Sequence, residues 1–325
     1  MGCELDFRSG LGVLISLATG VGSSLSNLCI VLTQYGGASQ FQVGFIIAFG
    51  GLIALVIILL CKGIGLLPDL WKDRIIVLAN GVIYTLCGIA LFYALPRAPL
   101  GNVITIVAAG QPIFTPIFAC VLLRERWRLI DIVATVLDII AVLLIAQPAF
   151  LFGESTNTTP EEAVAYTLAF VASLGLSLCF VLGRLVGQRV HPFVTTLYLN
   201  LVSSISNGIL MFAISKPSWD FDYTVWLELL AVCLLGNLNE VGRYAALKLE
   251  FAPTVVLVQN IHIAITYILE VTVLNEKATT LDIVGATIVL SSSMMVAIVT
   301  WWQNTRTKRR LDEEAELQSL VSKDN

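Results

Sequence analysis

A motif near the middle of the chain reads Glu125-Arg126-Trp127-Arg128-Leu129-Ile130-Asp131-Ile132-Val133-Ala134. A second copy nearer the C-terminus reads Glu276-Lys277-Ala278-Thr279-Thr280-Leu281-Asp282-Ile283-Val284-Gly285. Both begin with glutamate and carry Asp-Ile-Val six residues later. In each copy, one long apolar stretch ends just before the motif and another begins inside it. The motif therefore predicts two related halves and indicates how the apolar stretches are grouped.

The composition around this motif is that of a membrane protein. Of the 325 residues, 57% are hydrophobic and 13% are charged, and the mean hydropathy is +0.87. Soluble domains carry about 25% charged residues, so a chain this apolar is expected to have lipid as its main solvent. The net charge of -4 and the lack of a basic, aromatic-interleaved patch argue against nucleic-acid binding.

Ten apolar stretches are long enough to cross the roughly 30 Å of hydrocarbon in a bilayer. We expect an all-α membrane protein with these stretches as its transmembrane helices. They lie at 11–33, 42–61, 75–94, 100–123, 129–147, 164–187, 193–214, 225–248, 253–274 and 281–301.

The loops between these stretches differ in charge. With ten spans, fifteen of the 19 Lys and Arg residues fall on the side of the two termini and three on the other side. Because Lys and Arg are retained in the cytosol, this bias predicts that both termini are cytosolic. The expected plan is a cytosolic N-terminus (1–10), a first repeat (11–147), a non-cytosolic linker (148–163), a second repeat (164–301) and a cytosolic tail (302–325).

The linker contains Asn157-Thr158-Thr159, a glycosylation sequon. Two interpretations stay open: a glycan on Asn157, or a polar turn in which the sequon arose by chance. The charge bias is compatible with the plasma membrane and with the endoplasmic reticulum or Golgi alike.

Five spans per half is an odd number, so the two halves enter the membrane from opposite sides. The Glu125 motif is then cytosolic and the Glu276 motif is not. Inverted five-helix repeats are typical of alternating-access carriers, which bind substrate between the repeats near the midplane. Ala98-Pro99 and Ala252-Pro253, which open the fourth and ninth spans, are a second echo between the halves.

The chain resembles the EamA domains of the drug/metabolite transporter superfamily over about residues 11–301. The resemblance rests on the two five-span halves, the Ala-Pro entry to the fourth span and the junction from Leu122 to Val133. Residues 93–102 and 147–153 are similar to the G-subfamily of the solute carriers that also include nucleotide-sugar transporters. The resemblance implies a ten-span fold, a central substrate and peripheral fifth and tenth helices, often at a homodimer contact.

Polar residues inside the spans are the candidate site, because a charge at the bilayer centre costs about 2.5–3.5 kcal/mol. Glu240 and Arg243 lie three apart on one helical face. Two interpretations stay open: Arg243 attracts an anionic group while Glu240 positions Arg243 or exchanges a proton, or the two residues only neutralise each other. Gln111 precedes Pro112, and Pro116 follows one turn later, which predicts a kinked helix at the site or one kinked for packing alone. The eight residues expected around the substrate are Asn80, Tyr84, Gln111, Asn239, Glu240, Arg243, Gln259 and His262.

Asp138 lies in the middle of the fifth span, away from the substrate in the resemblance. Two interpretations of it stay open: a protonated acid hydrogen-bonded to a neighbour, or one bonded across a dimer contact. Two histidines and no Walker A pattern argue against a metal site, a cofactor, an enzyme and an ATP-driven pump. We expect a gradient-driven transporter of a small organic anion or zwitterion. The alternatives are a nucleotide-sugar exchanger of the secretory pathway and a non-transporting membrane protein that binds a partner through its tail.

Overall fold

The computed structural model describes residues 2–94, 97–98, 100–125, 127–147, 159–214, 217–273 and 279–321, and every regular element in these ranges is helical. Ten helices or helix pairs are long and apolar enough to cross a membrane. The first half holds α1 (Gly2–Tyr35), α2 (Gln40–Cys61), α3 (Trp71–Ala94), α4 (Leu100–Phe118), the π-helical turn η1 (Ala119–Leu123) and α5 (Leu129–Ala146). The second half holds α7 (Pro160–Gly187), α8 (Pro192–Ala213), α9 (Tyr223–Leu249), α10 (Ala252–Gln259), α11 (Ile261–Val273) and α12 (Thr280–Val321).

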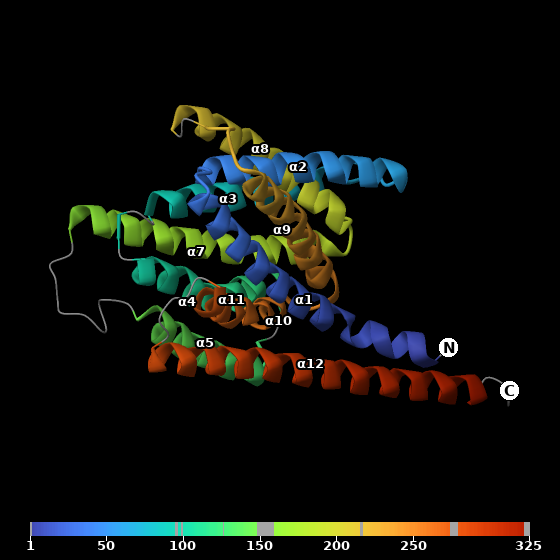
Figure 1. Cartoon of the computed structure of the whole chain (residues 1–325). Coiled ribbons are helices and arrows are strands. Elements are labelled where there is room, and N and C mark those ends of the chain that lie inside the picture. The colour runs from blue at the N-terminus through green and yellow to red at the C-terminus, as the bar shows by residue number, and fades with distance from the viewer. Residues whose placement is uncertain are drawn as a thin grey trace.

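The ten expected spans are therefore confirmed, with two differences of detail. The ninth span is divided into α10 and α11 at Asn260. The helix of the tenth span continues past residue 301, because α12 runs on as one helix to Val321. Figure 1 shows that α1 begins and α12 ends at the same end of the bundle, which we call the terminal end. The other end is called the opposite end.

The packing of the helices follows the inverted repeat. α1 lies along α9, and its counterpart α7 lies along α3, which is the counterpart of α9. The pairs α2 with α8 and α5 with α12 each join a helix to its own counterpart. In Figure 1 these two pairs form the two edges of the bundle, with the remaining helices between them. Each contact in one half thus has an equivalent contact in the other, as a twofold axis in the membrane plane requires.

The repeated motif caps the same helix in both halves. Asp131 Oδ2 accepts a hydrogen bond from the backbone N–H of Arg128 (3.3 Å), three residues earlier, at the start of α5. Asp282 Oδ2 accepts one from the backbone N–H of Thr279 (2.8 Å) at the start of α12. The first N–H groups of a helix have no partner inside it, so a carboxylate at this position stabilises the helix start. The shared Asp-Ile-Val therefore has a structural role.

Candidate functional site

A central cavity of about 580 Å³ lies between the two halves and is lined by residues from α1, α2, α3, α4, α7, α8, α9, α10 and α11. Seven of the eight residues expected around a substrate line it: Tyr84, Gln111, Asn239, Glu240, Arg243, Gln259 and His262. Asn80 is not among the lining residues; it is 1% exposed and donates from Nδ2 to the hydroxyl of Tyr244 (2.6 Å). Asn80 therefore contacts α9 instead of the cavity.

The charged centre of the cavity is formed by α9 and α3. Arg243 Nη1 donates to Glu240 Oε2 at 3.1 Å, and the Tyr84 hydroxyl donates to Glu240 Oε1 at 3.0 Å. The guanidinium carbon of Arg243 lies 5.3 Å from the ring centre of Phe180. Arg243 Nε is buried without a hydrogen-bond partner among the described residues. The pair is therefore neutral overall, and the side chain of Arg243, which is 22% exposed, forms part of the cavity wall.

The break in the ninth span is stabilised by side chains at the cavity wall. His262 Nδ1 hydrogen-bonds the carbonyl oxygen of Gln259 (2.8 Å), and Ser24 Oγ donates to the carbonyl oxygen of His262 (3.0 Å). Gln259 Nε2 donates to Thr19 Oγ1 (2.7 Å). These contacts join the break to α1, and they satisfy backbone groups that lipid would leave unpaired.

The fourth span is interrupted differently from the ninth. α4 passes through Pro112 and Pro116 as one helix, followed by the π-helical turn η1. Pro116 has no N–H for the carbonyl oxygen of Pro112. Thr135 Oγ1 of α5 lies 3.3 Å from that oxygen and 2.8 Å from the carbonyl oxygen of Asp131, and it shares its single proton between the two. Gln111 thus lies in the cavity wall, while the carbonyl oxygen of Pro112 contacts α5.

One polar wall of the cavity was not anticipated. Asn200, Ser203 and Asn207 of α8 line it, and Asn200 Nδ2 donates to Asn237 Oδ1 of α9 (2.6 Å). Their spacing of three and four residues places them on one helical face, which is a signal that the sequence does contain. These uncharged amides and hydroxyls add hydrogen-bonding capacity to the cavity wall.

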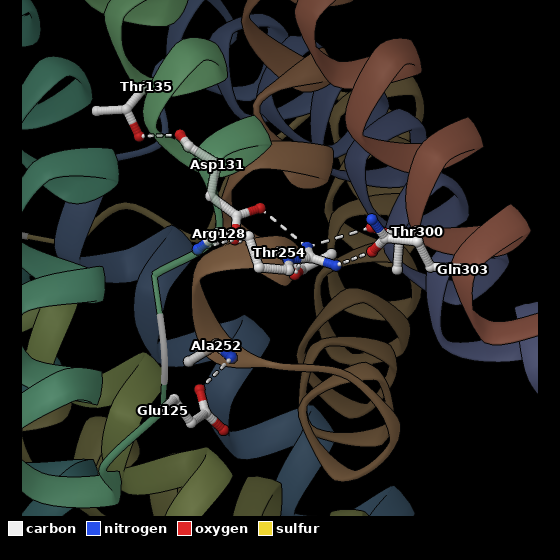
Figure 2. Close-up of polar contacts among 8 residues, drawn as sticks. All are labelled: Glu125, Arg128, Asp131, Thr135, Ala252, Thr254, Thr300 and Gln303. Atoms are coloured by element: carbon white, nitrogen blue, oxygen red, sulfur yellow. Dashed lines mark hydrogen bonds and ion pairs between the residues drawn. The ribbon is translucent and has the colours of Figure 1, made fainter. Parts of the chain in front are cut away.

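A polar layer lies at the terminal end, and Figure 2 shows the contacts that Glu125 and Arg128 make in it. Arg184 Nε donates to Glu125 Oε1 (2.9 Å), and Glu125 Oε2 accepts from the backbone N–H of Ala252 (3.3 Å). Arg128 binds Asp131 through two nitrogens and also donates to Thr254 Oγ1 (2.6 Å), as Figure 2 shows. The layer thus joins the start of α10 to α7 and to the loop before α5.

Small residues bring the backbones together at the same end. A Cβ atom placed on Gly183 of α7 would lie 2.8 Å from the ring of Tyr244 in α9, and one on Gly187 would lie 3.2 Å from the Cα atom of Lys248. At the opposite end the cavity lining instead reaches Gly44, near the start of α2, and Phe92, near the end of α3. The cavity therefore extends toward the opposite end and is sealed at the terminal end.

A ten-span bundle of two inverted halves around a central cavity has the architecture of alternating-access carriers. The sequence agrees with this class: residues 10–147 and 163–298 match the model of the EamA-like transporter family. The chain belongs to this family and is an integral, multi-pass membrane protein.

Two relatives resemble the chain over 238 residues, or 72% of its length. Solute carrier family 35 member G1 of Homo sapiens is 25% identical to it, and the same protein of Mus musculus is 26% identical. The match covers 65% and 64% of those relatives, which is less than two thirds of their length.

A solved crystal structure shares the fold. It superimposes with a TM-score of 0.72 over 90% of this chain and 97% of its own, at 14% sequence identity. Ten spans packed in this way are thus a known arrangement.

Proposed function

We propose that the protein is a gradient-driven carrier that moves a small organic anion or zwitterion across a membrane by alternating access. The observation that carries this proposal is a cavity of about 580 Å³ between inverted halves, with Arg243 in its wall. Membership of a transporter family supports the general activity. The charge and class of the substrate are inferred from the cavity.

The sign of the substrate follows from the donors and charges in the wall. Arg243 is the only Lys or Arg among the described residues that line the cavity, and its side chain is 22% exposed. A carboxylate that approaches Arg243 shares it with Glu240, and the Tyr84 hydroxyl holds Glu240 in place meanwhile. Arg243, which is already paired with Glu240, can bind one carboxylate. It can equally bind the carboxylate of a zwitterion whose ammonium group approaches Glu240. A nucleotide diphosphate sugar carries two phosphates, and the described cavity wall offers only one arginine, Arg243, to bind them.

The mechanism follows from the unequal ends of the cavity. The terminal end is sealed by the Glu125–Arg184 contact and by close packing of α7 on α9, while the lining extends toward the opposite end. If the two halves exchanged conformations, the terminal end would open and the opposite end would close. We propose that both termini are cytosolic, as the loop charges favour, so that the cavity here faces away from the cytosol.

The test is tracer exchange in proteoliposomes. The purified full chain is reconstituted in vesicles loaded with one unlabelled acid, and uptake of its radiolabelled form is followed for a panel of mono-, di- and tricarboxylates, amino acids and nucleotide sugars. We expect exchange of at least one carboxylate or amino acid and a loss of about tenfold or more in Arg243→Ala. Arg97→Ala, at an exposed residue that is not among those lining the cavity, is the matched control and retains exchange.

Transport of nucleotide sugars alone would replace the substrate class in this proposal. Equal exchange by wild type and Arg243→Ala for every transported acid would show that Arg243 is not the anion-binding residue. Absence of exchange for the whole panel, in vesicles that contain folded protein, would refute the carrier function for these substrates.

A further inference from the structure

Asp138 is a carboxyl group at the junction of three helices, away from the charged centre of the cavity. It stands on α5 with 0% exposure, and its partners come from two other helices. Asn260 Nδ2, at the break between α10 and α11, donates to Asp138 Oδ2 at 2.7 Å. The hydroxyl of Ser292 on α12 is hydrogen-bonded to Asp138 Oδ1. The carboxyl group therefore ties the break in the ninth span to α5 and α12.

The hydrogen bonds of Ser292 indicate which group holds a proton. Ser292 Oγ also lies 3.1 Å from the carbonyl oxygen of Val289, which can only accept a hydrogen bond. A hydroxyl has a single proton to donate. In the arrangement where Ser292 donates to Val289, it accepts from Asp138 Oδ1, and this carboxyl oxygen carries the proton; in the other arrangement Ser292 donates to an ionised Asp138. In the first arrangement Oδ2 remains an acceptor for Asn260, and all donors and acceptors in the group are matched.

Charges nearby do not offer an alternative partner for an ionised Asp138. α5 packs against α4, α10 and α12, and the residues of α4 and α10 include no ionisable side chain. On α5, Asp131 is seven residues away, about 10 Å along the helix, and is paired with Arg128.

The remaining ionisable groups of the neighbouring helices are engaged elsewhere or distant. Asp282 and Arg306 on α12 are ten and fourteen residues from Ser292, about 15 and 21 Å. On α11, Glu270 is about 15 Å along the helix from Asn260. His262 bonds the carbonyl oxygen of Gln259. A carboxylate here would be buried without a cation, which costs far more than burying the neutral acid.

Asn260 connects this buried acid to the proposed transport cycle. It is among the residues that line the central cavity, and it occupies the turn that divides the ninth span. A change in the break that opens the terminal end would move the Asn260 amide away from Asp138 and admit water to the carboxyl group. The proton on Oδ1 would then pass to that water, and the carboxylate would accept a hydrogen bond from Ser292.

We propose that Asp138, held by Asn260 and Ser292, is the proton-binding site that couples transport to a proton gradient. The proton is bound when the terminal end is closed and released to water when it opens. The inference rests on the proposed carrier function for its coupling role. The protonated state of Asp138 in the closed form is a property of the fold and is tested without any substrate.

The first experiment is infrared spectroscopy of the full chain in proteoliposomes at pH 7. A protonated carboxylic acid has a C=O stretch separate from the amide bands. We expect wild type to show this band. Asp138→Asn, an isostere that keeps both hydrogen bonds, should lack the main component of the protonated-acid band. Ser292→Ala shifts the band by removing the hydrogen-bond acceptor, which keeps the assignment testable if Asp138→Asn folds poorly.

Ser293→Ala is the matched control. Ser293 is one residue further along α12 and donates to the carbonyl oxygen of Leu257 (2.9 Å), so its removal leaves the Asp138 band unchanged. Identical spectra for wild type, Asp138→Asn and Ser292→Ala would overturn the proposal. A band that is lost when sodium replaces potassium in the buffer would assign the site to a metal cation, and it would also overturn the proposal.

The second experiment tests coupling with the radiolabelled carboxylates and amino acids of the exchange panel. We expect an inward proton gradient to drive uphill accumulation by wild type. Asp138→Asn should retain exchange within about twofold and lose at least tenfold in accumulation. Gradient-driven accumulation by Asp138→Asn would refute the coupling role. If wild type exchanges no tracer, the carrier function fails, while the infrared band still decides whether Asp138 holds a proton.

Discussion

Arg184 Nε and Glu125 Oε1 lie 2.9 Å apart, and this contact joins the last turn of α7 to the loop before α5. Arg184 Nη1 also donates to the carbonyl oxygens of Leu247 (2.9 Å) and Lys248 (3.1 Å) at the end of α9. The side chains of both partners are largely buried, at 17% and 9% exposure. One arginine thus holds three elements together at the sealed end of the cavity.

Glu125→Gln should loosen this seal, because it removes the charge that holds Arg184 and keeps the side-chain shape. We expect a cysteine placed at Ser203 in the cavity to react about five- to tenfold faster with a thiol reagent supplied from the terminal end, equivalent to roughly 1–1.4 kcal/mol in the closing equilibrium. The assay uses sided vesicles and a membrane-impermeant maleimide, in a background without the native cysteines. Lys72→Gln, an exposed change at the same end, should leave the rate at the parent value, and an equal rate in Glu125→Gln would contradict the role of the contact.

Gly51→Ala should disrupt the polar wall of the cavity. A Cβ atom at Gly51 of α2 would overlap the side chains of Asn237 and Asn200, whose hydrogen bond joins α8 to α9. Overpacking of this kind typically costs about 1–3 kcal/mol. We expect a lower melting temperature in detergent, measured by intrinsic fluorescence, and reduced tracer exchange. Gly88→Ala is the control for stability on α3, where the added methyl group meets nothing within 4 Å, and a similar fall in melting temperature in both variants would contradict this account.

Glu250 predicts a pH dependence of the sealed end. It is 6% exposed at the end of α9, and burial raises its pKa to about 7, although the hydrogen bond from Asn304 and the charges of Arg128 and Arg184 favour ionisation. The folded protein therefore holds this proton more tightly than the unfolded chain, whose value is near 4.5. The contribution of Glu250 to the stability of the fold is therefore complete below about pH 4.5 and is lost as the pH rises through about 7.

The measurement is the melting temperature of wild type and Glu250→Gln between pH 4.5 and 8. Because the glutamine does not titrate, the difference between the two proteins isolates Glu250. We expect wild type to lose about 2–4 °C relative to Glu250→Gln over this range. A difference that is constant with pH, or that changes in favour of wild type at high pH, would show that Glu250 is ionised throughout.

Arg128→Lys should destabilise the start of α5 despite the retained charge. Arg128 binds both oxygens of Asp131 (2.8 and 2.9 Å) and reaches Thr254 of α10, and a lysine ammonium cannot make these planar contacts together. We expect a loss of about 1–2 kcal/mol, seen as a melting temperature lower by several degrees. Arg97→Lys, which replaces an exposed contact with the carbonyl oxygen of Tyr93, should change it little.

The spans, the two halves and the pairing of Glu240 with Arg243 could be predicted from the sequence because each depends on local information. Hydropathy over about 20 residues marks a span whatever surrounds it. Residues three apart on a helix share a face, so Glu240 and Arg243 meet at 3.1 Å without help from the rest of the fold. The polar face of α8 carried the same kind of signal and was predictable in principle.

The closing contact, the place of Asp138 and the position of Asn80 were decided by the tertiary structure. Glu125 and Arg184 are 59 residues apart in sequence, and Asp138 is 122 residues from Asn260 and 154 from Ser292. Asn80 shares a face with Tyr84, yet the packing of α9 turns it to Tyr244 and away from the cavity. Periodicity states which side chains share a helical face, while the angle and depth at which helices meet determine what that face contacts. The sequence by itself therefore determined a ten-span protein in two inverted halves, and only the packing of those halves decided which polar groups surround the cavity, seal its end and hold the buried acid.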